Sequence, residues 1–460
     1  MPVEREVLAR IRPSAEQERQ LERVVRDIVT RIRQLSHYFE TDVEPMVAGS
    51  VAKGTHLRDP DIDLFMLFPP EMPKELIAEK GLAIARSIMD GEERYAQHPY
   101  LRGTYEGFTV DLVPAYKLKD TRQLQTAVDR TPFHVAFVNE HLKGEQRDEV
   151  RLLKQFMRGI GTYGAEEATQ GFSGYLVELL VMRYGTFQGA LKGLLELPPG
   201  KALDLFDMLR EGDRPAPSEV ATFEDPLVFV DPVDPGRNVA SSLSAQSLGL
   251  TRQAAAEYLA APTVRFFFPG RPDALPPERL RNLMEVRETK VLGISLPVFH
   301  ENPDVVHGQL RKAVRAINRL CNLSGFPVLH ADHRVVGKEC LIMLELEVAV
   351  LPAATVHHGP KVGVGNDHEF LAKWAKDGRT LAGPYVEDGQ WRVDVLRQHT
   401  RVEELLRAEL PSLNLGKQLN KELAPGVKLM TAEELLAPQY ADALTAFLKR
   451  IPPWRWGEVK

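Results

Sequence analysis

The sequence predicts an α+β protein in which a small mixed-sheet unit comes first, a helical domain follows, and an α/β body with a helical tail comes last. Three observations support this order. Short apolar segments alternate with helical patterns before residue 140, helical periodicity dominates from 145 to 197, and strands return after residue 280. At 460 residues the chain also exceeds one compact domain. We expect domains over 1–140, 141–265 and 266–460.

The composition is that of an ordinary globular protein, with 43% hydrophobic and 27% charged residues. No apolar run approaches the ~20 residues that a membrane-spanning helix needs. Cys321 and Cys340 are the only cysteines, too few for a disulfide framework or a zinc ribbon, so we expect a cytoplasmic protein. The net charge of −6 gives no general attraction to nucleic acid, and such a partner would need local basic surfaces.

The first domain is expected to open with a long helix. Ser14 and Gln17 fit a capping box at its start, and apolar residues from Leu21 to Ile32 recur at helical spacing. A strand follows near 43–47, and Gly49-Ser50 ends it. The other elements expected in this domain are a strand over 61–68, a helix over 73–89 and a strand over 110–113.

The rest of the chain is expected to be helical first and mixed later. Helices occupy 145–197, an Asp- and Pro-rich loop covers 225–242, and a helical piece runs to Pro262 before a short strand and a linker over 266–272. The later elements are a helix over 278–287, a strand over 289–295, a helix over 307–324, a strand over 339–349 and a mostly helical stretch over 366–450. Pro453–Trp456 is expected to be a docked tail.

Three aspartates are the residues that most clearly indicate a function. Asp61 and Asp63 flank Ile62 in a strand, so both project from one face while Ile62 points to the core. Asp111 lies between apolar residues of a later strand, and adjacent strands would bring the three carboxylates together. Such carboxylates repel one another unless a cation lies between them. Mg²⁺ prefers oxygen ligands and completes its shell with substrate phosphates, so the pattern predicts a two-Mg²⁺ site for a nucleotide substrate.

Gly49-Ser50 and Lys53 provide the complementary groups for that substrate. A glycine lets the backbone approach an anion closely, and neighbouring N–H groups form a binding nest. The Ser50 hydroxyl and the Lys53 ammonium add a donor and a charge for phosphates. An isolated Asp-x-Asp is usually a solvated turn and an isolated Gly-Ser is weaker still. The combination with a third Asp in a later strand is much more specific.

At these residues the sequence resembles the DNA polymerase β nucleotidyltransferase superfamily. Further motifs narrow the resemblance to the archaeal-type (class I) CCA-adding tRNA nucleotidyltransferases. These motifs are Arg94–Tyr100, Ala127–His134, Arg151–Lys154, Gly164–Glu166, Gly171–Tyr175, Val230–Asp234 and Arg237–Ala240. The similarity is dense from residue 44 to 242 and thinner from there to about 420.

The resemblance implies an enzyme that adds or repairs the 3′-terminal CCA of tRNA without a template, using CTP and ATP and releasing pyrophosphate. Asp61, Asp63 and Asp111 would hold the Mg²⁺ ions, and Asp111 would help to deprotonate the attacking 3′-hydroxyl. The nucleotide would be bound by Gly49, Ser50, Lys53, Thr131, His134, Lys154, Tyr163 and Arg237. Of these, Arg237 would read the base, because a guanidinium presents several donors to a base edge.

The resemblance also implies that the partner is tRNA, bound through its acceptor stem and 3′ end. The tRNA-binding body over 266–460 would have a topology related to the RNA-recognition motif. The basic residues Arg311, Lys312, Arg315 and Arg319 lie along one predicted helix. This stripe is either a solvated face or a site for the tRNA backbone. The segment before Leu415-Gly416-Lys417 lacks the histidines and aromatics that the family would have there. The sequence leaves the oligomeric state open, with a homodimer among the options.

Two other functions remain open. The chain could be another RNA 3′-end nucleotidyltransferase of the same superfamily, such as a poly(A) polymerase. It could also be a non-catalytic tRNA-binding relative. Arg237 and the segment around His134 argue against the first, and the retention of three aspartates with Ser50 argues against the second.

Overall fold

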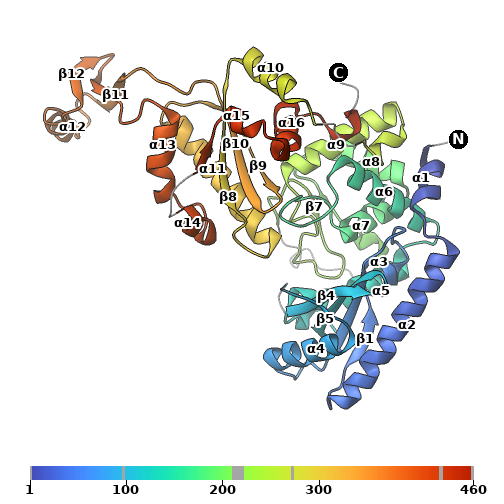
Figure 1. The fold of residues 1–460 in the computed structure, drawn as a ribbon. Coiled ribbons are helices and arrows are strands. Elements are labelled where there is room, and N and C mark those ends of the chain that lie inside the picture. The colour runs from blue at the N-terminus through green and yellow to red at the C-terminus, as the bar shows by residue number, and fades with distance from the viewer. Residues whose placement is uncertain (1–2, 96–98, 210–221, 271–273, 424–427, 457–460) are drawn as a thin grey trace. The chain divides into compact units, whose positions relative to one another are not determined.

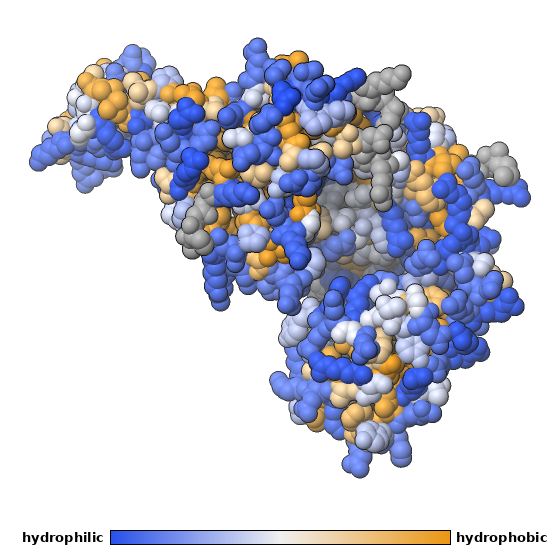
Figure 2. Space-filling view, viewed as in Figure 1, coloured by the Kyte–Doolittle hydropathy of each residue, from blue (hydrophilic) through white to orange (hydrophobic). Residues whose placement is uncertain are grey.

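The computed structural model describes residues 3–95, 99–209, 222–270, 274–423 and 428–456. The chain divides into two compact units, one comprising 1–271 with 452–460 and the other 272–451 (Figure 1). The expected α+β class is confirmed, since both units contain helices and β-sheets. The described residues contain no helix long and apolar enough to cross a membrane. Hydrophilic side chains cover most of the face seen in Figure 2.

The first unit contains a five-stranded mixed sheet in the order β1-β2-β5-β4-β3. Strands β2 and β5 are parallel, and the other neighbours are antiparallel. The bounds of the strands are β1 Glu44–Val47, β2 Ile62–Phe68, β3 Gly91–Tyr95, β4 Pro99–Tyr105 and β5 Phe108–Tyr116. Strands β3 and β4 were not expected from the sequence. Residues 96–98, which belong to the motif Arg94–Tyr100, lie outside the described residues.

Helices cover both faces of this sheet. On one face, α2 (Ala15–Tyr38) and α4 (Lys74–Ile88) bury a core with the even-numbered residues of β2 and β5, among them Leu64 and Leu112. The capping box at Ser14 and Gln17 is present. On the other face, α3 (Gly49–Lys53) and α5 (Thr131–His141) pack against the odd-numbered side, which also carries the aspartates. The sheet therefore separates a purely apolar face from a face that holds the site.

The rest of the first unit is helical and shares one large core. Its helices are α6 Gln146–Ile160, α7 Gly174–Tyr184, α8 Phe187–Glu196 and α9 Ala245–Ala260, with a short parallel pair β6 Ala202–Leu203 and β7 Val228–Phe229. An unexpected first helix, α1 (Val3–Ile11), joins this core. A 3-10 turn at Val264–Phe266 replaces the short strand expected there.

The chain returns to this core near its C-terminus. Trp454 is buried in it, and its indole N–H donates to Glu257 over 2.7 Å. The guanidinium of Arg455 pairs with the same carboxylate at 2.7 Å. The expectation of a docked tail at Pro453–Trp456 is thus met for Trp454 and Arg455.

The second unit is built on an antiparallel sheet in the order β14-β8-β10-β9. Alternate residues of its strands bury two cores on opposite faces, so that Ile294 packs beneath α11 and Val291 packs with α10 and α16. The elements are α10 Pro277–Arg287, β8 Lys290–Pro297, α11 Pro303–Leu323, β9 Val328–Val336, β10 Glu339–Leu346, α13 Val402–Glu409, α14 Lys417–Leu423, β14 Lys428–Met430, α15 Ala432–Leu435 and α16 Ala441–Lys449.

The expectation of a mostly helical stretch over 366–450 is wrong in its first part. After the helix α12 (Asp367–Trp374), strands β12 and β13 lie in this part, and with β11, which precedes residue 366, they form a separate antiparallel sheet in the order β11-β13-β12. Its strands are β11 Ala354–Lys361, β12 Thr380–Glu387 and β13 Gln390–Leu396. Asp388-Gly389 joins the last two strands with φ of 53° and 73°, which is the tight hairpin turn that an Asp-Gly pair favours.

Candidate active site

The paired strands β2 and β5 bring two of the three aspartates together. Asp63 is the register partner of Asp111 across the parallel ladder, and Asp61 directly precedes β2. Ile62 is fully buried on the opposite side, as strand alternation predicts. Asp111 is buried to 8% exposure while the Asp61 side chain stays half exposed. The carboxylates therefore lie at the N-terminal ends of two adjacent strands.

An arginine that sequence reasoning missed lies between these carboxylates. Arg102 on β4 is the register partner of Asp111 on β5. Its Nη1 donates to Oδ2 of Asp111 and its Nη2 donates to Oδ2 of Asp61, each over 2.8 Å. Among the described residues, no group of three carboxylate, imidazole or thiol side chains is placed to hold a metal ion. The positive charge next to the aspartates is here that of the guanidinium.

The environment raises the proton affinity of two of the carboxylates. Burial, followed by the charges of Asp111 and Asp61, raises the pKa of Asp63 to about 6. Burial also raises the pKa of Asp111, although Arg102 acts in the opposite direction. The Oδ1 atom of Asp111 is buried without a hydrogen-bond partner. An unpaired buried carboxylate oxygen is costly, and a cation would satisfy it.

Gly49 makes the closest approach to this cluster. Its φ is +60°, and a Cβ atom at this position would lie 1.8 Å from Oδ2 of Asp63. A side chain at residue 49 would therefore displace the Asp63 carboxylate, and the backbone conformation itself favours glycine. The preceding residue also holds the two segments together, because the backbone N–H of Ala48 donates to the backbone carbonyl of Asp63 over 2.8 Å. Ser50 follows on α3 and is half buried.

Lys53 and Lys154 belong to a buried ionic network around Glu178 of α7. The Lys53 Nζ lies 2.5 Å from Oε2 of Glu178, and the Lys154 Nζ lies 3.6 Å from Oε1. Thr55 donates its hydroxyl to Oε1 over 2.6 Å. Burial alone would raise the pKa of Glu178, but the two ammonium groups outweigh it and hold this pKa below its usual value. Burial lowers the pKa of Lys154 to about 8, against the charge of Glu178.

Two basic residues of α6, Arg151 and Lys154, face protein rather than solvent. Arg151 donates to the carbonyls of Gly54 and His56 over 2.7 and 2.8 Å, and Lys154 donates to the carbonyl of Thr55 over 3.1 Å. Both side chains are buried, with 9% and 3% of the residue exposed. Arg151 and Lys154 are therefore not part of a solvated surface, whereas Arg158 on the same helix is exposed. The helix instead fixes the loop that leads from α3 to the aspartates.

A second cluster collects His134, Tyr175 and Arg237 around the fully buried Asp231. Nε2 of His134 lies 2.9 Å from Oδ2 of Asp231, and Nη1 of Arg237 donates to the same oxygen over 2.8 Å. The ring of His134 stacks on Tyr175 with centroids 3.9 Å apart. Burial lowers the pKa of His134 despite the nearby carboxylate. Asp231 was within a recognised motif, but its role as the common partner of these groups was not foreseen.

The Glu178 network and the Asp231 cluster are neighbours, because the Lys53 ammonium of the first lies 5.7 Å from the ring centroid of Tyr175 in the second. Tyr163 lies beside them: a Cβ atom added to Gly174 would lie 3.1 Å from its hydroxyl and 4.0 Å from Nζ of Lys154. Burial raises the pKa of Tyr163 to about 12. Thr131 is the first residue of α5, three positions before His134. The first unit thus contains every residue expected to bind the metal or the nucleotide.

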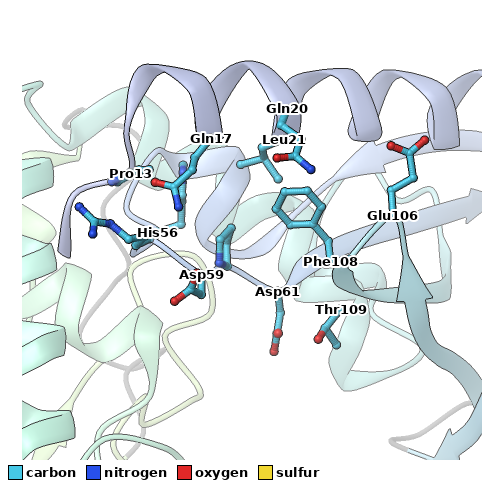
Figure 3. A pocket seen from close by; sticks show the side chains of 13 residues that line it. Pro13, Gln17, Gln20, Leu21, His56, Asp59, Asp61, Glu106, Phe108 and Thr109 are labelled. Carbon is cyan, nitrogen blue, oxygen red and sulfur yellow. The ribbon is translucent and has the colours of Figure 1, made fainter. Parts of the chain in front are cut away.

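A pocket of about 430 Å³ adjoins Asp61 (Figure 3). Its wall includes Gln17 and Leu21 of α2 and Phe108 and Thr109 of β5. In Figure 3, Asp61 and Thr109 lie at one end of the pocket and α2 lies at the other. The pocket is an open space next to the most exposed of the three carboxylates.

The basic stripe predicted on 307–324 lies on α11 of the second unit. Lys312, Arg315 and Arg319 are exposed, whereas Arg311 is half buried. The opposite face of the helix packs into the core through Leu310 and other apolar residues. Lys312 also donates to Asn414 over 2.6 Å. The exposed cations therefore share one side of a well-anchored helix.

Three family models match the chain: a nucleotidyltransferase domain over 25–134, the second domain of tRNA nucleotidyltransferases over 148–268, and the C-terminal domain of CCA-adding enzymes over 287–432. Solved structures also resemble it. The E. coli protein CdnC bound to ATP is 18% identical with a TM-score of 0.45, covering 58% of this chain and 93% of that one.

Curated relatives match almost the full length. The CCA-adding enzyme of Methanoregula boonei is 34% identical, and the match covers 98% of this chain and 96% of that enzyme. The CCA-adding enzyme of Halorubrum lacusprofundi is 36% identical, with 97% and 99% covered. That of Methanosarcina acetivorans is 35% identical, with 93% of each chain covered. With this identity over nearly the whole chain, the protein belongs to the family of CCA-adding enzymes, the tRNA nucleotidyltransferases resembled by its motifs.

Proposed function

We propose that the protein is a CTP(ATP):tRNA nucleotidyltransferase that adds or repairs the 3′-terminal CCA of tRNA without a nucleic-acid template. The 3′-hydroxyl of the RNA attacks the α-phosphorus of CTP or ATP, and pyrophosphate leaves. The observation that carries this proposal is the register pair Asp63–Asp111 with Asp61 beside it, on a chain whose family adds CCA. The Asp111 carboxylate accepts the proton of the attacking hydroxyl, for which a raised pKa is suited.

The chemistry of the three aspartates suits Mg²⁺, although Arg102 now pairs with two of them. The buried, unpartnered Oδ1 of Asp111 and the raised pKa of Asp63 both indicate carboxylates that lack a sufficient counter-charge. Asp61, Asp63 and Asp111 would hold the metal, since hard cations take carboxylate oxygens. When bound, Mg²⁺ supplies positive charge that stabilises the oxygens of the attacking and leaving groups.

The nucleotide is proposed to lie along the face that carries α3, α5, α6 and α7. Gly49 leaves the backbone open beside Asp63, and Ser50 adds a hydroxyl donor. Lys53 and Lys154 supply charge for the triphosphate, while Glu178 holds both ammonium groups in place. Tyr163, after α6, joins the lysines at the triphosphate. Thr131 and His134 of α5 contact the sugar and phosphates.

The base is proposed to be read by Arg237. Asp231 holds one end of its guanidinium, so the remaining N–H groups have a fixed direction. A fixed donor set favours a base with matching acceptors, because a mismatched base leaves buried polar groups unpaired. His134 stacks on Tyr175 and contacts the same Asp231 carboxylate as Arg237. The residue proposed to contact the sugar and the residue proposed to read the base are therefore held by one carboxylate.

The tRNA backbone is proposed to contact the exposed stripe Lys312, Arg315 and Arg319, with Arg311 beside it, on α11. Three cations on one side of a helix suit a row of phosphates, and phosphate contacts supply most of the affinity for nucleic acid. These contacts are sequence-independent and would position the acceptor stem.

The proposal is tested by adding one labelled NTP at a time to tRNA that lacks one, two or three terminal nucleotides. We expect CMP to enter the two shorter tRNAs and AMP to enter the tRNA that lacks only its last residue. Asp63→Asn should abolish incorporation, whereas the matched control Asp42→Asn, at an exposed aspartate of the same domain, should retain it. Incorporation that survives in Asp63→Asn would refute the assignment of the carboxylates. Equal use of UTP and GTP would refute the assignment of CCA addition.

A further inference from the structure

Arg102 bridges two different catalytic carboxylates. Its two terminal nitrogens each donate over 2.8 Å, one to Asp61 and one to Asp111. The guanidinium fork suits such a double contact and stays charged at any ordinary pH. Since Arg102 lies directly opposite Asp111 in the β4–β5 ladder, the backbone itself holds it at this place.

The oxygens that Arg102 uses belong to residues assigned to the metal. Oδ2 of Asp61 and Oδ2 of Asp111 accept its two hydrogen bonds, while Oδ1 of Asp111 has no partner. A divalent cation and a guanidinium are both drawn to the same negative charge, but their positive charges repel each other. Each therefore weakens the binding of the other.

The guanidinium has room to leave. The Arg102 side chain is 28% exposed, and it lines an open groove of about 510 Å³ beside strands β3 and β4. Asp90 and Glu92 line the same groove together with Arg94, which pairs with Glu92, so a displaced guanidinium would meet Asp90 and solvent there. Displacement of this side chain consequently removes no apolar packing from the core.

We propose that Arg102 is a built-in counter-ion of the catalytic carboxylates, which occupies them in the metal-free enzyme and competes with the divalent metal. This inference rests on the proposed function, because it takes the aspartates as the metal site. It makes Arg102 a positioning residue: it keeps Asp61 and Asp111 together before the metal arrives and sets the metal affinity below what the carboxylates alone would give.

The test measures the binding of Mn²⁺ alone to the full-length protein. Binding is detected as the loss of the free-ion signal in electron paramagnetic resonance. Arg102→Met should bind Mn²⁺ about tenfold more tightly than the wild type, within the usual range for coupling between two binding equilibria. Arg102→Lys should lie between the two, since an ammonium is a point charge without the fork. In EDTA, Arg102→Met should melt at a lower temperature, because Asp61 and Asp111 then face each other unpaired.

The matched control is Arg86→Met, which removes an exposed arginine that pairs with Glu93 in the same domain. Its Mn²⁺ affinity should equal that of the wild type. Equal or weaker Mn²⁺ binding by Arg102→Met, in a variant with unchanged circular dichroism, would overturn the proposal. Nucleotide incorporation by the wild type is measured on the same preparation. If it proceeds while Arg102→Met binds Mn²⁺ no better, the counter-ion role fails and the proposed function stands.

Discussion

Gly49 shows how one residue without a side chain determines the geometry of the site. Its positive φ is one constraint, and the 1.8 Å that would separate a Cβ atom from Asp63 is the stronger one. Gly49→Ala should therefore lower the rate of nucleotide incorporation by about 100-fold, since a displacement of about 1 Å at a reacting group has effects of that size.

The control for this variant is Gly185→Ala. Gly185 also has a positive φ, of 82°, but an added Cβ atom there would meet nothing within 4 Å. It should cost about 1–2 kcal/mol of stability from backbone strain and leave the rate of incorporation unchanged. If the two variants lose activity equally, the close approach to Asp63 does not matter.

Asp63 makes the stability of the metal-free enzyme depend on pH. Its folded pKa of about 6 lies above the usual 3.8, so the folded state binds the proton more tightly than the unfolded state. Stability therefore falls as the pH rises from about 4 to 6, with a difference of about 1–3 kcal/mol at neutral pH. In EDTA at pH 7, Asp63→Asn should melt above the wild type, and the gap should close near pH 4. A gap that is constant across this range would contradict the assignment of the raised pKa to Asp63.

Glu178 is the counter-charge for two buried ammonium groups. Glu178→Gln leaves Lys53 and Lys154 without a carboxylate, so we expect a loss of about 3–5 kcal/mol in the free energy of unfolding. Glu433→Gln is the control, because Glu433 pairs with Arg281 at the surface and should change stability by less than about 1 kcal/mol. Urea denaturation measures both. A small loss for Glu178→Gln would mean that the lysines are not held as an ionic network.

At the residue scale, the sequence allowed only part of the site to be predicted. Asp63 and Asp111 could be found because each lies within an apolar strand, where an acidic residue stands out. Arg102, Glu178 and Asp231 could not, because each gains its role from partners that the fold brings together. Arg102 lies on a strand that was not foreseen, and Glu178 lies on a mostly apolar helix.

At the scale of elements, local signals predicted helices better than edge strands. The capping box at Ser14 and the apolar periodicity of α2 were sufficient for that helix. Strand β3 was missed because all of its residues are exposed, so that it carries no apolar alternation. In the β11-β13-β12 sheet, the hairpin turn at Asp388-Gly389 was the available signal, but the strands around it are largely exposed.

The β11-β13-β12 sheet should unfold independently of the larger sheet beside it in the chain. Its core consists of Trp374, Val393 and Val395, with Phe370 packed against them. Trp374→Ala should cost about 3–5 kcal/mol, which is more than so small a core can lose. Hydrogen exchange should then lose protection over 354–396 and keep it over β8 and β10. Leu381→Ala, at a 52% exposed residue, should leave exchange unchanged, and a global loss of protection in Trp374→Ala would contradict this independence.

At the scale of the molecule, the chain order and the spatial order differ at the C-terminus. The described tail through Trp456 returns to the first unit, where Trp454 joins the core of the central helices. Apolar periodicity predicts elements and not such long-range returns, because the partner of Trp454 lies almost 200 residues earlier at Glu257. The limits 1–140, 141–265 and 266–460 remain a prediction about domains.

We expect this one protein to build the sequence C-C-A on a tRNA end. The most direct measurement is to sequence the 3′ ends made by the wild type on a tRNA lacking its last three nucleotides, with all four NTPs and Mg²⁺ present. We expect the products to end in CCA and to grow no further, and Asp63→Asn to leave the RNA unextended. Long runs of A, mixed ends or growth beyond CCA would contradict it.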